Sequence, residues 1–340
     1  MNVDGLKLTS YFGERKRNGR RLLANALMDL YGREELTTSI MLRGAEGFGL
    51  KHHLRTDHSL TLSDDLPAVT VAVDRRERIE AVLERTAELE PGLITLEVAR
   101  LLTGDITPVA LAEGMHEATK LTVYLGRQER VYRVPAYVAV CDLLHRRGVA
   151  GATVLLGVDG TAHGVRERAR FFGRNAQVPM MVIAVGSGEQ IARVLPELGG
   201  LLREPLLTLE RVRVCKRDGQ LLDTPHVMPS RDEHGMPMWQ RLMIYTSEAG
   251  LHHGRPIHRA VTRRLRSTGA AGSTTLFGIW GFHGDHAPHG DRPFQLGRHV
   301  PTVTVVIDSP DRIAQSFAII DELTSERGLV TSEVIPARTL

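Results

Sequence analysis

The sequence predicts an α+β protein in which one βαββαβ unit occurs three times in tandem. The first observation is internal similarity, because three related segments begin at Leu8, Leu121 and Leu242. When their tyrosines are superimposed, a glycine follows 33 residues later in every copy, and another follows three residues after that. The tyrosines are Tyr11, Tyr124 and Tyr245, and the paired glycines are Gly44 and Gly47, Gly157 and Gly160, and Gly278 and Gly281. The second observation is a proline that opens an apolar run at the same place in each copy: Pro67, Pro179 and Pro301.

Each repeat has the same predicted succession of strands and helices. It opens with an alternating strand, LKLTSYF in the first copy, which a helix with an apolar stripe follows. In the second and third copies a proline, Pro135 or Pro256, stands where the first turn of that helix tolerates it. A second strand leads to the paired glycines, and a polar loop of about 18 residues precedes the apolar third strand. A second amphipathic helix and a fourth strand (GLITLEV, PLLTLER or GLVTSEV) complete a ferredoxin-like βαββαβ order.

The repeats set the expected domain organisation. We expect repeats over residues 1–102, 119–215 and 239–340, joined by linkers over 103–118 and 216–238. Both linkers are rich in proline, glycine and polar residues, and they are long enough to cross between units on the outside. A βαββαβ unit covers one sheet face with its helices and leaves the other apolar face without a partner. Three such faces in one chain can bury one another.

Composition excludes several classes of protein. Of the 340 residues 42% are hydrophobic and 24% charged, which is typical of a folded soluble domain. No apolar run is long enough to span a bilayer, and the first residues do not resemble a signal peptide. Two cysteines, Cys141 and Cys215, cannot form a disulfide scaffold, so we expect a cytoplasmic protein. The chain has 5 lysines against 38 arginines, but no basic run interleaved with aromatics, so we expect no nucleic-acid partner.

The motifs of the repeats resemble those of a known family. The opening LKLTSYFGE, the turn LRGAEGFG, the strand LPAVTVAVD and the closing GLITLE together resemble the domain of unknown function 190, a PII-like family. Repeat 3 has GIWGFHG at the turn, and repeat 2 reads GVDGTAHG and lacks the GFG. The resemblance implies PII-like repeats packed around a threefold axis, here as an intrachain pseudo-trimer. It also implies that small molecules, often adenine nucleotides, bind in clefts between units, close to a long loop that then meets a partner.

The glycine turn and its basic neighbours form the first candidate site. Glycines let the backbone approach a phosphate, adjacent N–H groups form an anion nest, and Lys or Arg add charge pairing. Arginines after the fourth strand form a second set, which the resemblance places in the same clefts. The candidate effector-binding residues are Arg43, Gly44, Gly47, Gly49, Lys51, Arg100, Gly157, Gly160, Arg213, Gly278 and Gly281. The alternative is a tight strand-to-loop turn with exposed arginines and no ligand, because the turn lacks the Walker spacing.

A second candidate is a metal site in the stretch WGFHGDHAPHGD of repeat 3. His283, Asp285, His286 and His289 are ligand types that suit zinc, copper or nickel. No HExxH or comparable pair of ligands on a helix accompanies them, and loop histidines are usually solvated. A metal is therefore the less favoured ligand. No nucleophile or paired-carboxylate motif stands in a suitable context, so we expect no enzymatic activity.

These observations predict a non-enzymatic PII-like regulatory protein. We expect a small anionic effector, for which an adenine nucleotide is the first choice, to bind between repeats and order the long loops. The loops would then control a protein partner, for example a membrane transporter or channel. Two alternatives stay open: a metal-binding PII-like protein that uses the His-rich loops, and a ligand-free structural adaptor. Because the three copies differ, we also expect that not every cleft binds.

Overall fold

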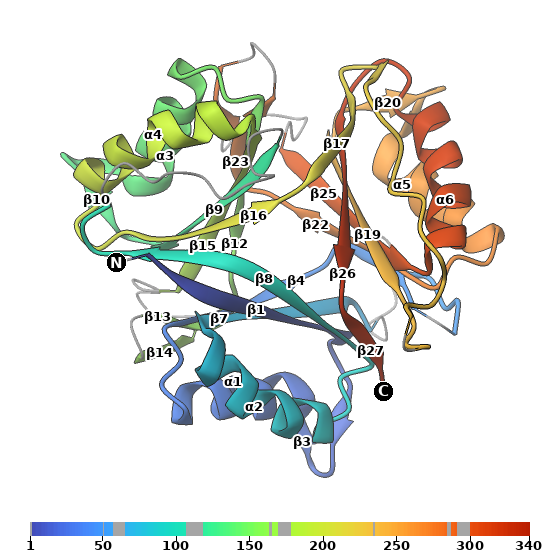
Figure 1. Ribbon diagram of the computed structural model, residues 1–340, viewed down its shortest axis with the longest axis horizontal. Coiled ribbons are helices and arrows are strands. Elements are labelled where there is room, and N and C mark those ends of the chain that lie inside the picture. Colours follow the sequence, from blue (N-terminus) through green and yellow to red (C-terminus); the bar gives the residue numbers. More distant parts are fainter. Residues whose placement is uncertain are drawn as a thin grey trace.

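The computed structural model describes residues 2–49, 51–56, 65–106, 118–162, 165–168, 178–233, 235–283, 287–290 and 300–340. Three lobes surround a common centre, with repeat 1 in blue, repeat 2 in green and repeat 3 in orange and red (Figure 1). Helices lie on the outside of each lobe, and strands from all three lobes meet inside. This arrangement creates a junction wherever two repeats adjoin.

Repeat 1 has the predicted order of elements. Its helices are α1 (Leu23–Arg33) and α2 (Arg76–Glu88). Its four main strands are β1 (Asn2–Gly13), β4 (Thr38–Arg43), β7 (Pro67–Arg75) and β8 (Leu93–Thr103). They lie side by side as β4-β7-β1-β8, and every neighbouring pair is antiparallel. A short hairpin, β2 (Arg17–Asn18) and β3 (Arg21–Leu22), stands between β1 and α1.

Repeats 2 and 3 reproduce this plan. Repeat 2 consists of β9 (Thr119–Gly126), β10 (Arg130–Val131), β11 (Val134–Pro135), α3 (Ala136–Arg146), β12 (Gly151–Leu156), β15 (Pro179–Gly186), α4 (Gly188–Leu201) and β16 (Leu206–Arg211). Repeat 3 consists of β19 (Trp239–Ser247), β20 (Leu251–His252), β21 (Arg255–Pro256), α5 (Ile257–Ser267), β22 (Ser273–Phe277), β25 (Pro301–Asp308), α6 (Pro310–Leu323) and β26 (Leu329–Ile335). Their strand orders, β12-β15-β9-β16 and β22-β25-β19-β26, match that of repeat 1. The prediction of three βαββαβ repeats in an α+β chain is confirmed.

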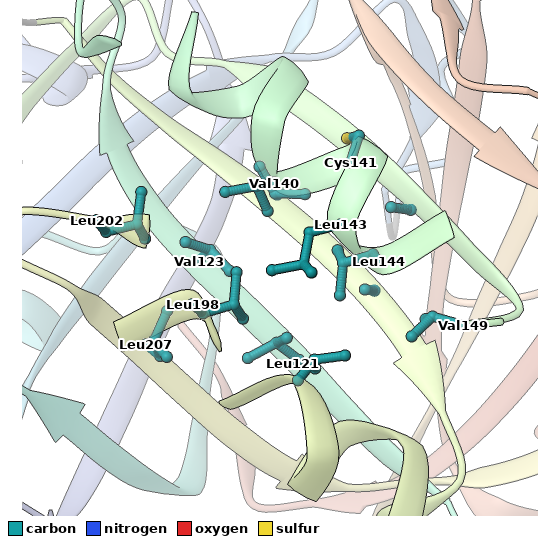
Figure 2. Packing of buried hydrophobic residues seen from close by; sticks show 14 of the residues in the cluster. Leu121, Val123, Val140, Cys141, Leu143, Leu144, Val149, Leu198, Leu202 and Leu207 are labelled. Atoms are coloured by element: carbon teal, nitrogen blue, oxygen red, sulfur yellow. The ribbon is translucent and has the colours of Figure 1, made fainter. Parts of the chain in front are cut away.

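Period-two alternation explains how each sheet acquires two buried faces. In β1, Leu6 and Leu8 pack under the helices of repeat 1, so Lys7 between them must point to the opposite face. The same helix-side packing occurs in repeat 2, where Leu143 of α3 and Leu198 of α4 share a cluster with Leu121 of β9 (Figure 2). Each lobe therefore has its own core between helices and sheet.

The inner sheet faces share a second kind of core. One apolar cluster contains residues of all three repeats, among them Val71, Ile183 and Val305. These residues come from the third strand of each repeat, β7, β15 and β25. Each sheet thus covers the apolar inner faces of the other two.

The strand that follows each glycine turn crosses into a neighbouring repeat. In repeat 1 this strand is β5 (Glu46–Phe48), which pairs with β22 of repeat 3. In repeat 2 it is β13 (Asp159–Ala162), which pairs with β4 of repeat 1. In repeat 3 it is β23 (Trp280–His283), which pairs with β12 of repeat 2. The sequence predicted a polar loop at these positions. The short strands found there could not be predicted because their partner strands lie in another repeat. The remaining short strands of this region are β6 (Arg55–Thr56), β14 (Val165–Arg168) and β24 (His289–Gly290).

The segment after each fourth strand crosses in the opposite direction around the ring. The end of β8 pairs with β16 of repeat 2, and β17 (Arg213–Arg217) pairs with β26 of repeat 3. The last strand, β27 (Ala337–Thr339), pairs with β8 of repeat 1 and closes the circle. A further strand, β18 (Gln220–Leu221), folds back on β17. Two strand crossings therefore link every pair of repeats.

Candidate functional site

The main cavity lies at the junction between repeats 1 and 3. Its volume is about 580 Å³, which is within the range of small-molecule sites. Two crossings frame it: β5 reaches from repeat 1 to β22, and β27 reaches from repeat 3 to β8. Tyr11 and Phe12 of β1 line one side, and Thr339 and Leu340 line the end near β27. The same two crossings that join the repeats therefore also form the walls of a cavity, which we call the 1–3 cleft.

Repeat 3 gives the 1–3 cleft a mainly apolar wall. Val305 and Ile307 of β25 and the half-buried indole of Trp239 lie on this side. Repeat 1 adds Phe48, whose side chain is only 4% exposed and whose ring lies 5.9 Å from the His52 ring in a stacked arrangement. A flat apolar group has aromatic partners here.

Repeat 1 supplies the cations of the 1–3 cleft. Lys16 follows β1 in a turn closed by a 2.9 Å bond from its N–H to the Gly13 carbonyl. Lys51 lies in a second turn, where the His52 N–H donates to the Gly49 carbonyl at 2.8 Å. Arg15, His53 and Arg55 also line the cleft. Asp65 holds Arg55 at 3.0 Å and accepts from the Arg15 N–H at 2.7 Å, so it offsets part of this charge.

The five lysines of the chain divide into two groups. Lys7, Lys120 and Lys216 are buried and form ion pairs with carboxylates. Lys16 and Lys51 both line the 1–3 cleft. In a chain with 38 arginines, the lysines outside the buried ion pairs are therefore gathered at one cavity. Lysine presents a compact, mobile positive charge that suits a phosphate or another small anion.

A second cleft lies at the corresponding junction between repeats 3 and 2, but its volume is only about 30 Å³. Tyr245, Thr246 and Pro301 line it at the repeat positions of Tyr11, Phe12 and Pro67 in the 1–3 cleft. Apolar side chains fill this junction, namely Ala118, Val185, Val212, Val214, Tyr245 and Leu329. Arg217 and Asp218 also line it, and the Asp218 N–H donates to the Gly328 carbonyl at 2.8 Å. Equivalent junctions in this chain thus differ greatly in the room they offer a ligand.

The paired glycines hold the repeats together. The N–H groups of Gly44, Gly157 and Gly278 donate to the carbonyls of Pro67, Pro179 and Pro301 at 2.7, 3.0 and 2.7 Å. At the second glycine of each pair, an added methyl group would clash with a carbonyl oxygen of a neighbouring repeat. The pairs are Gly47 with Ser273, Gly160 with Ser39, and Gly281 with Ala152. These glycines are needed because two backbones approach closely.

The candidate effector-binding residues do not form one site. Gly49 and Lys51 line the 1–3 cleft, with Arg55 beside them. Arg43 binds Glu14 at 3.0 Å, and Arg213 binds Asp223 at 3.3 Å. Arg100 lies on β8, opposite Leu209 of repeat 2. The six paired glycines lie at the strand crossings, so a ligand-binding role for the whole set stays a prediction.

The candidate metal ligands are only partly described. His283 lies on β23 and lines the small second cleft, whereas His289 lies on β24 with its Nδ1 3.0 Å from the Ala287 carbonyl. Asp285 and His286 lie outside the described residues. Within the described part of the chain, no group of three or more His, Cys, Asp or Glu side chains is arranged to hold a metal ion. The metal prediction therefore stays untested.

Sequence reasoning missed a ring of six charges at the centre, which we call the central charge ring. It contains Lys7 and Glu97 of repeat 1, Lys120 and Glu210 of repeat 2, and Arg241 and Glu333 of repeat 3. Each cation contacts the carboxylate of its own repeat, at 2.5, 2.8 and 2.5 Å respectively. Each also contacts the carboxylate of another repeat: Lys7 with Glu210 at 2.5 Å, Lys120 with Glu333 at 2.8 Å, and Arg241 with Glu97 at 2.7 Å. The ring therefore joins all three repeats.

The central charge ring is buried and electrically balanced. Its side chains are between 2% and 7% exposed. Burial alone would raise the pKa of Glu97, but the charges of Arg241 and Lys7 outweigh burial and keep this pKa below its ordinary value. Burial and the charge of Arg241 together lower the pKa of Lys120. The lowered pKa of Glu97 keeps this carboxylate ionised, and a missing member of the ring would leave an uncompensated buried charge.

A sequence signal for the ring was present. A cation stands four residues before each repeat tyrosine, and a glutamate stands two residues after the threonine of each fourth strand. A charge that recurs inside a buried strand of every repeat predicts a shared ion-pair network.

The fold and the cleft define a class of protein: a single chain of three βαββαβ repeats with a ligand-sized cavity at one repeat junction. The chain belongs to the DUF190 family, described as "Uncharacterized ACR, COG1993", whose model matches residues 5–101, 118–214 and 239–337. The predicted family is thereby confirmed. No helix in the described part of the chain is both long and apolar enough to cross a membrane.

The chain is also similar to one curated protein and was compared with solved structures. It is 35% identical over 86 residues to the UPF0166 protein MJ1524 of Methanocaldococcus jannaschii, a match that covers 25% of this chain and 78% of that protein. Among solved structures, a crystal structure of aspartate kinase from Synechocystis matches with a TM-score of 0.23 and 10% identity. That match covers 98% of this chain and 44% of the kinase chain. So low a TM-score carries no argument about fold or function.

Proposed function

We propose that this chain is a non-enzymatic PII-like regulatory protein that binds a small anionic effector in the 1–3 cleft. The supporting observation is the division of the cleft: an apolar wall from repeat 3 faces cations from repeat 1. An adenine nucleotide has both parts that such a cavity accommodates, a flat base and a phosphate chain. Trp239 and Phe48 would contact the base, and Lys16 and Lys51 would pair with phosphate.

The three repeats would reproduce within one chain the assembly that PII-like units form as trimers. The curated relative supports this reading, because the matched segment has about the length of one repeat and covers most of that protein. A single repeat has an apolar inner face and unpaired crossing strands, both of which need partner copies. Fusion allows the three clefts to differ, and we propose that the second cleft, at about 30 Å³, does not bind the effector.

Binding would act on the segments that follow the glycine turns. In repeat 1, the cleft residues Gly49, Lys51 and Arg55 belong to this segment. An effector that pairs with them favours one arrangement of the segment, and the altered surface would then meet a protein partner. A membrane transporter or channel is the partner class that the PII-like resemblance suggests.

Isothermal titration calorimetry of the metal-free full chain with ATP, ADP, AMP and cyclic AMP tests this proposal. We expect fewer than three bound nucleotides per chain, because the 1–3 cleft offers a cavity of about 580 Å³ and the second cleft only about 30 Å³. The double variant Lys16→Ala/Lys51→Ala should lose most of the affinity. The matched control, Arg33→Ala/Arg146→Ala, removes the same charge from exposed helix ends and should bind normally.

A second readout uses the uneven distribution of lysines. An amine-directed reagent should label Lys16 and Lys51 in the folded chain, and saturating nucleotide should protect both. The same ligand at about 100 times its Kd should stabilise the fold by roughly 2.7 kcal/mol. Three equal sites per chain, unprotected lysines, or unchanged affinity in the lysine variant would contradict the proposal. Stabilisation by zinc that a His283/His286/His289 alanine variant abolishes would favour the metal alternative instead.

A further inference from the structure

Repeat 3 carries a basic surface that its sister repeats lack. Residues 255–267 contain five arginines and no acidic residue. The corresponding segment of repeat 1, residues 21–33, has two arginines and one aspartate, and that of repeat 2, residues 134–146, has one of each. The position held by Asp29 in α1 and Asp142 in α3 is occupied by Arg263 in α5. Three copies of one helix thus provide an internal control, and only α5 has gained positive charge.

The arginines of α5 are arranged along the outside of the helix. Ile257, Val261 and Leu265 face the core of repeat 3 and fix which side is buried. Arg259, Arg263 and Arg266 recur at spacings of four and three residues, so they lie on the opposite side. Arg255 lies in the hairpin before the helix, and the helices of repeat 3 lie at the outer edge of the molecule (Figure 1). We call this row the α5 basic face.

Two arginines of the α5 basic face, Arg263 and Arg266, retain charge that the described part of the chain does not neutralise, whereas Arg259 is half-buried and has an interaction partner of its own. Arg264 lies to one side and binds Glu322 of α6 at 2.6 Å. Arg263 and Arg266 are exposed, and no ion pair with a carboxylate of the described residues involves either of them. Two neighbouring guanidinium groups without carboxylates repel each other, so this surface has unused capacity to bind anions.

We infer that the α5 basic face is a docking surface for an acidic segment of a partner protein. Two exposed arginines three residues apart on a helix, Arg263 and Arg266, match carboxylates at the same spacing on a second helix. A membrane surface is less suitable, because the apolar side chains of α5 are buried in the repeat core and none can insert between lipids. A nucleic acid is less suitable because the chain's net charge is only +3, and α2 presents exposed glutamates elsewhere.

The helix that carries the docking surface packs on its buried side against Phe48, a residue of the 1–3 cleft. Phe48 lines the cleft, and it also belongs to the apolar cluster beneath α5 that contains Ile257 and Val261. A ligand that contacts Phe48 in the 1–3 cleft therefore contacts a side chain that also packs against the buried side of α5. This connection deepens the proposed function by giving the regulator a partner-binding surface. The docking itself requires no effector, so it can be tested without one.

The test measures fluorescence anisotropy of a dye-labelled helical peptide whose glutamates are spaced three and four residues apart, titrated with the full chain. A counterpart peptide has lysine at every glutamate position. At about 0.15 M salt, charges more than roughly 8 Å apart are largely screened, so local pairing is what the assay detects. We expect the glutamate peptide to bind, and Arg263→Glu/Arg266→Glu to weaken that binding by about tenfold or more. The same variant should bind the lysine peptide more tightly than the natural chain does.

The matched control is Arg33→Glu/Arg146→Glu, which changes net charge by the same amount at the ends of α1 and α3. It should leave binding of the glutamate peptide unchanged. The inference is overturned if the natural chain does not prefer the glutamate peptide, or if the control variant loses as much affinity. Tighter binding to a DNA duplex or to phosphatidylserine vesicles at the same salt also overturns it. Because nucleotide is absent throughout, failure here leaves the effector proposal standing.

Discussion

Replacing Arg241 with methionine tests whether the central charge ring holds the repeats together. The guanidinium is 4% exposed and binds Glu333 at 2.5 Å and Glu97 at 2.7 Å. Methionine retains much of the side-chain volume but contributes no charge. The variant therefore leaves two buried carboxylates, from two different repeats, that have lost a shared partner.

The expected cost follows from the balance of the ring. Three cations face three carboxylates, so loss of one cation leaves one buried negative charge without compensation. Breaking a buried ion pair by removing one partner costs about 3–5 kcal/mol. Lys7 and Lys120 still hold Glu97 and Glu333 from their other sides, so we place the loss at the lower end, about 3 kcal/mol.

Urea unfolding followed by far-UV circular dichroism measures this loss. Arg241→Lys is the matched control, because it makes repeat 3 match the lysines of repeats 1 and 2. We expect it to cost clearly less than Arg241→Met, since a cation is retained between the two carboxylates. In the double variant Arg241→Met/Glu333→Gln the buried charges balance again, and part of the lost stability should return.

Two results would refute this reasoning. One is a methionine variant within about 1 kcal/mol of the natural chain, which would show that the ring contributes little. The other is equal destabilisation by methionine and lysine, which would show that side-chain shape and not charge matters. Either result would indicate that the strand crossings and the shared apolar cluster contribute most of the noncovalent association between repeats.

Three further predictions concern acid stability, the glycine crossings and the cysteines. The pKa values of Glu97 and Glu333 lie below their ordinary value of 4.5, so their stabilising effect is complete above pH 4.5 and declines as pH falls further. The advantage of the natural chain over Arg241→Met in free energy of unfolding should therefore shrink as pH falls below 4.5, which urea unfolding at a series of pH values measures. Gly47→Ala would drive a methyl group into the Ser273 carbonyl and should cost about 1–3 kcal/mol, whereas Gly49→Ala meets nothing within 4 Å and should be nearly neutral in the same urea assay. Burial raises the pKa of Cys215 to about 12 and that of Cys141 further, so a thiol reagent at neutral pH should label neither until the chain is unfolded. Rapid labelling of the folded chain would contradict the buried thiols.

The repeat structure could be predicted because local signals repeat. Alternation in LKLTSYF, the apolar stripe after it and the proline before each third strand specify elements within one copy. Three copies at matching offsets then confirm one another, so the βαββαβ order followed from the sequence alone. The family motifs indicated which family the chain resembles, but the order of strands and helices could be predicted without them.

The strand crossings and the cleft could not be predicted in the same way. The segment EGF of β5 is short, and its partner on β22 lies more than 220 residues away. Nothing in its local sequence distinguishes it from a loop. The cleft residues Lys16, Lys51 and Trp239 come together only after β5 and β27 have crossed between repeats, so their proximity depends on the assembled fold.

The central charge ring and the clefts show how fusion constrains the repeats differently. Every ring cation contacts carboxylates of at least two repeats, so a change in one copy leaves a buried charge in another. Each cleft lies at one junction, so filling the cleft between repeats 2 and 3 leaves Lys16, Lys51 and Trp239 in place at the 1–3 cleft. Arg263 and Arg266 of α5 are exposed and lie outside the central charge ring, so a change there leaves no buried charge in another repeat. Specialisation of the copies is therefore expected at junction cavities and outer helices, and the chain differs among its repeats at both.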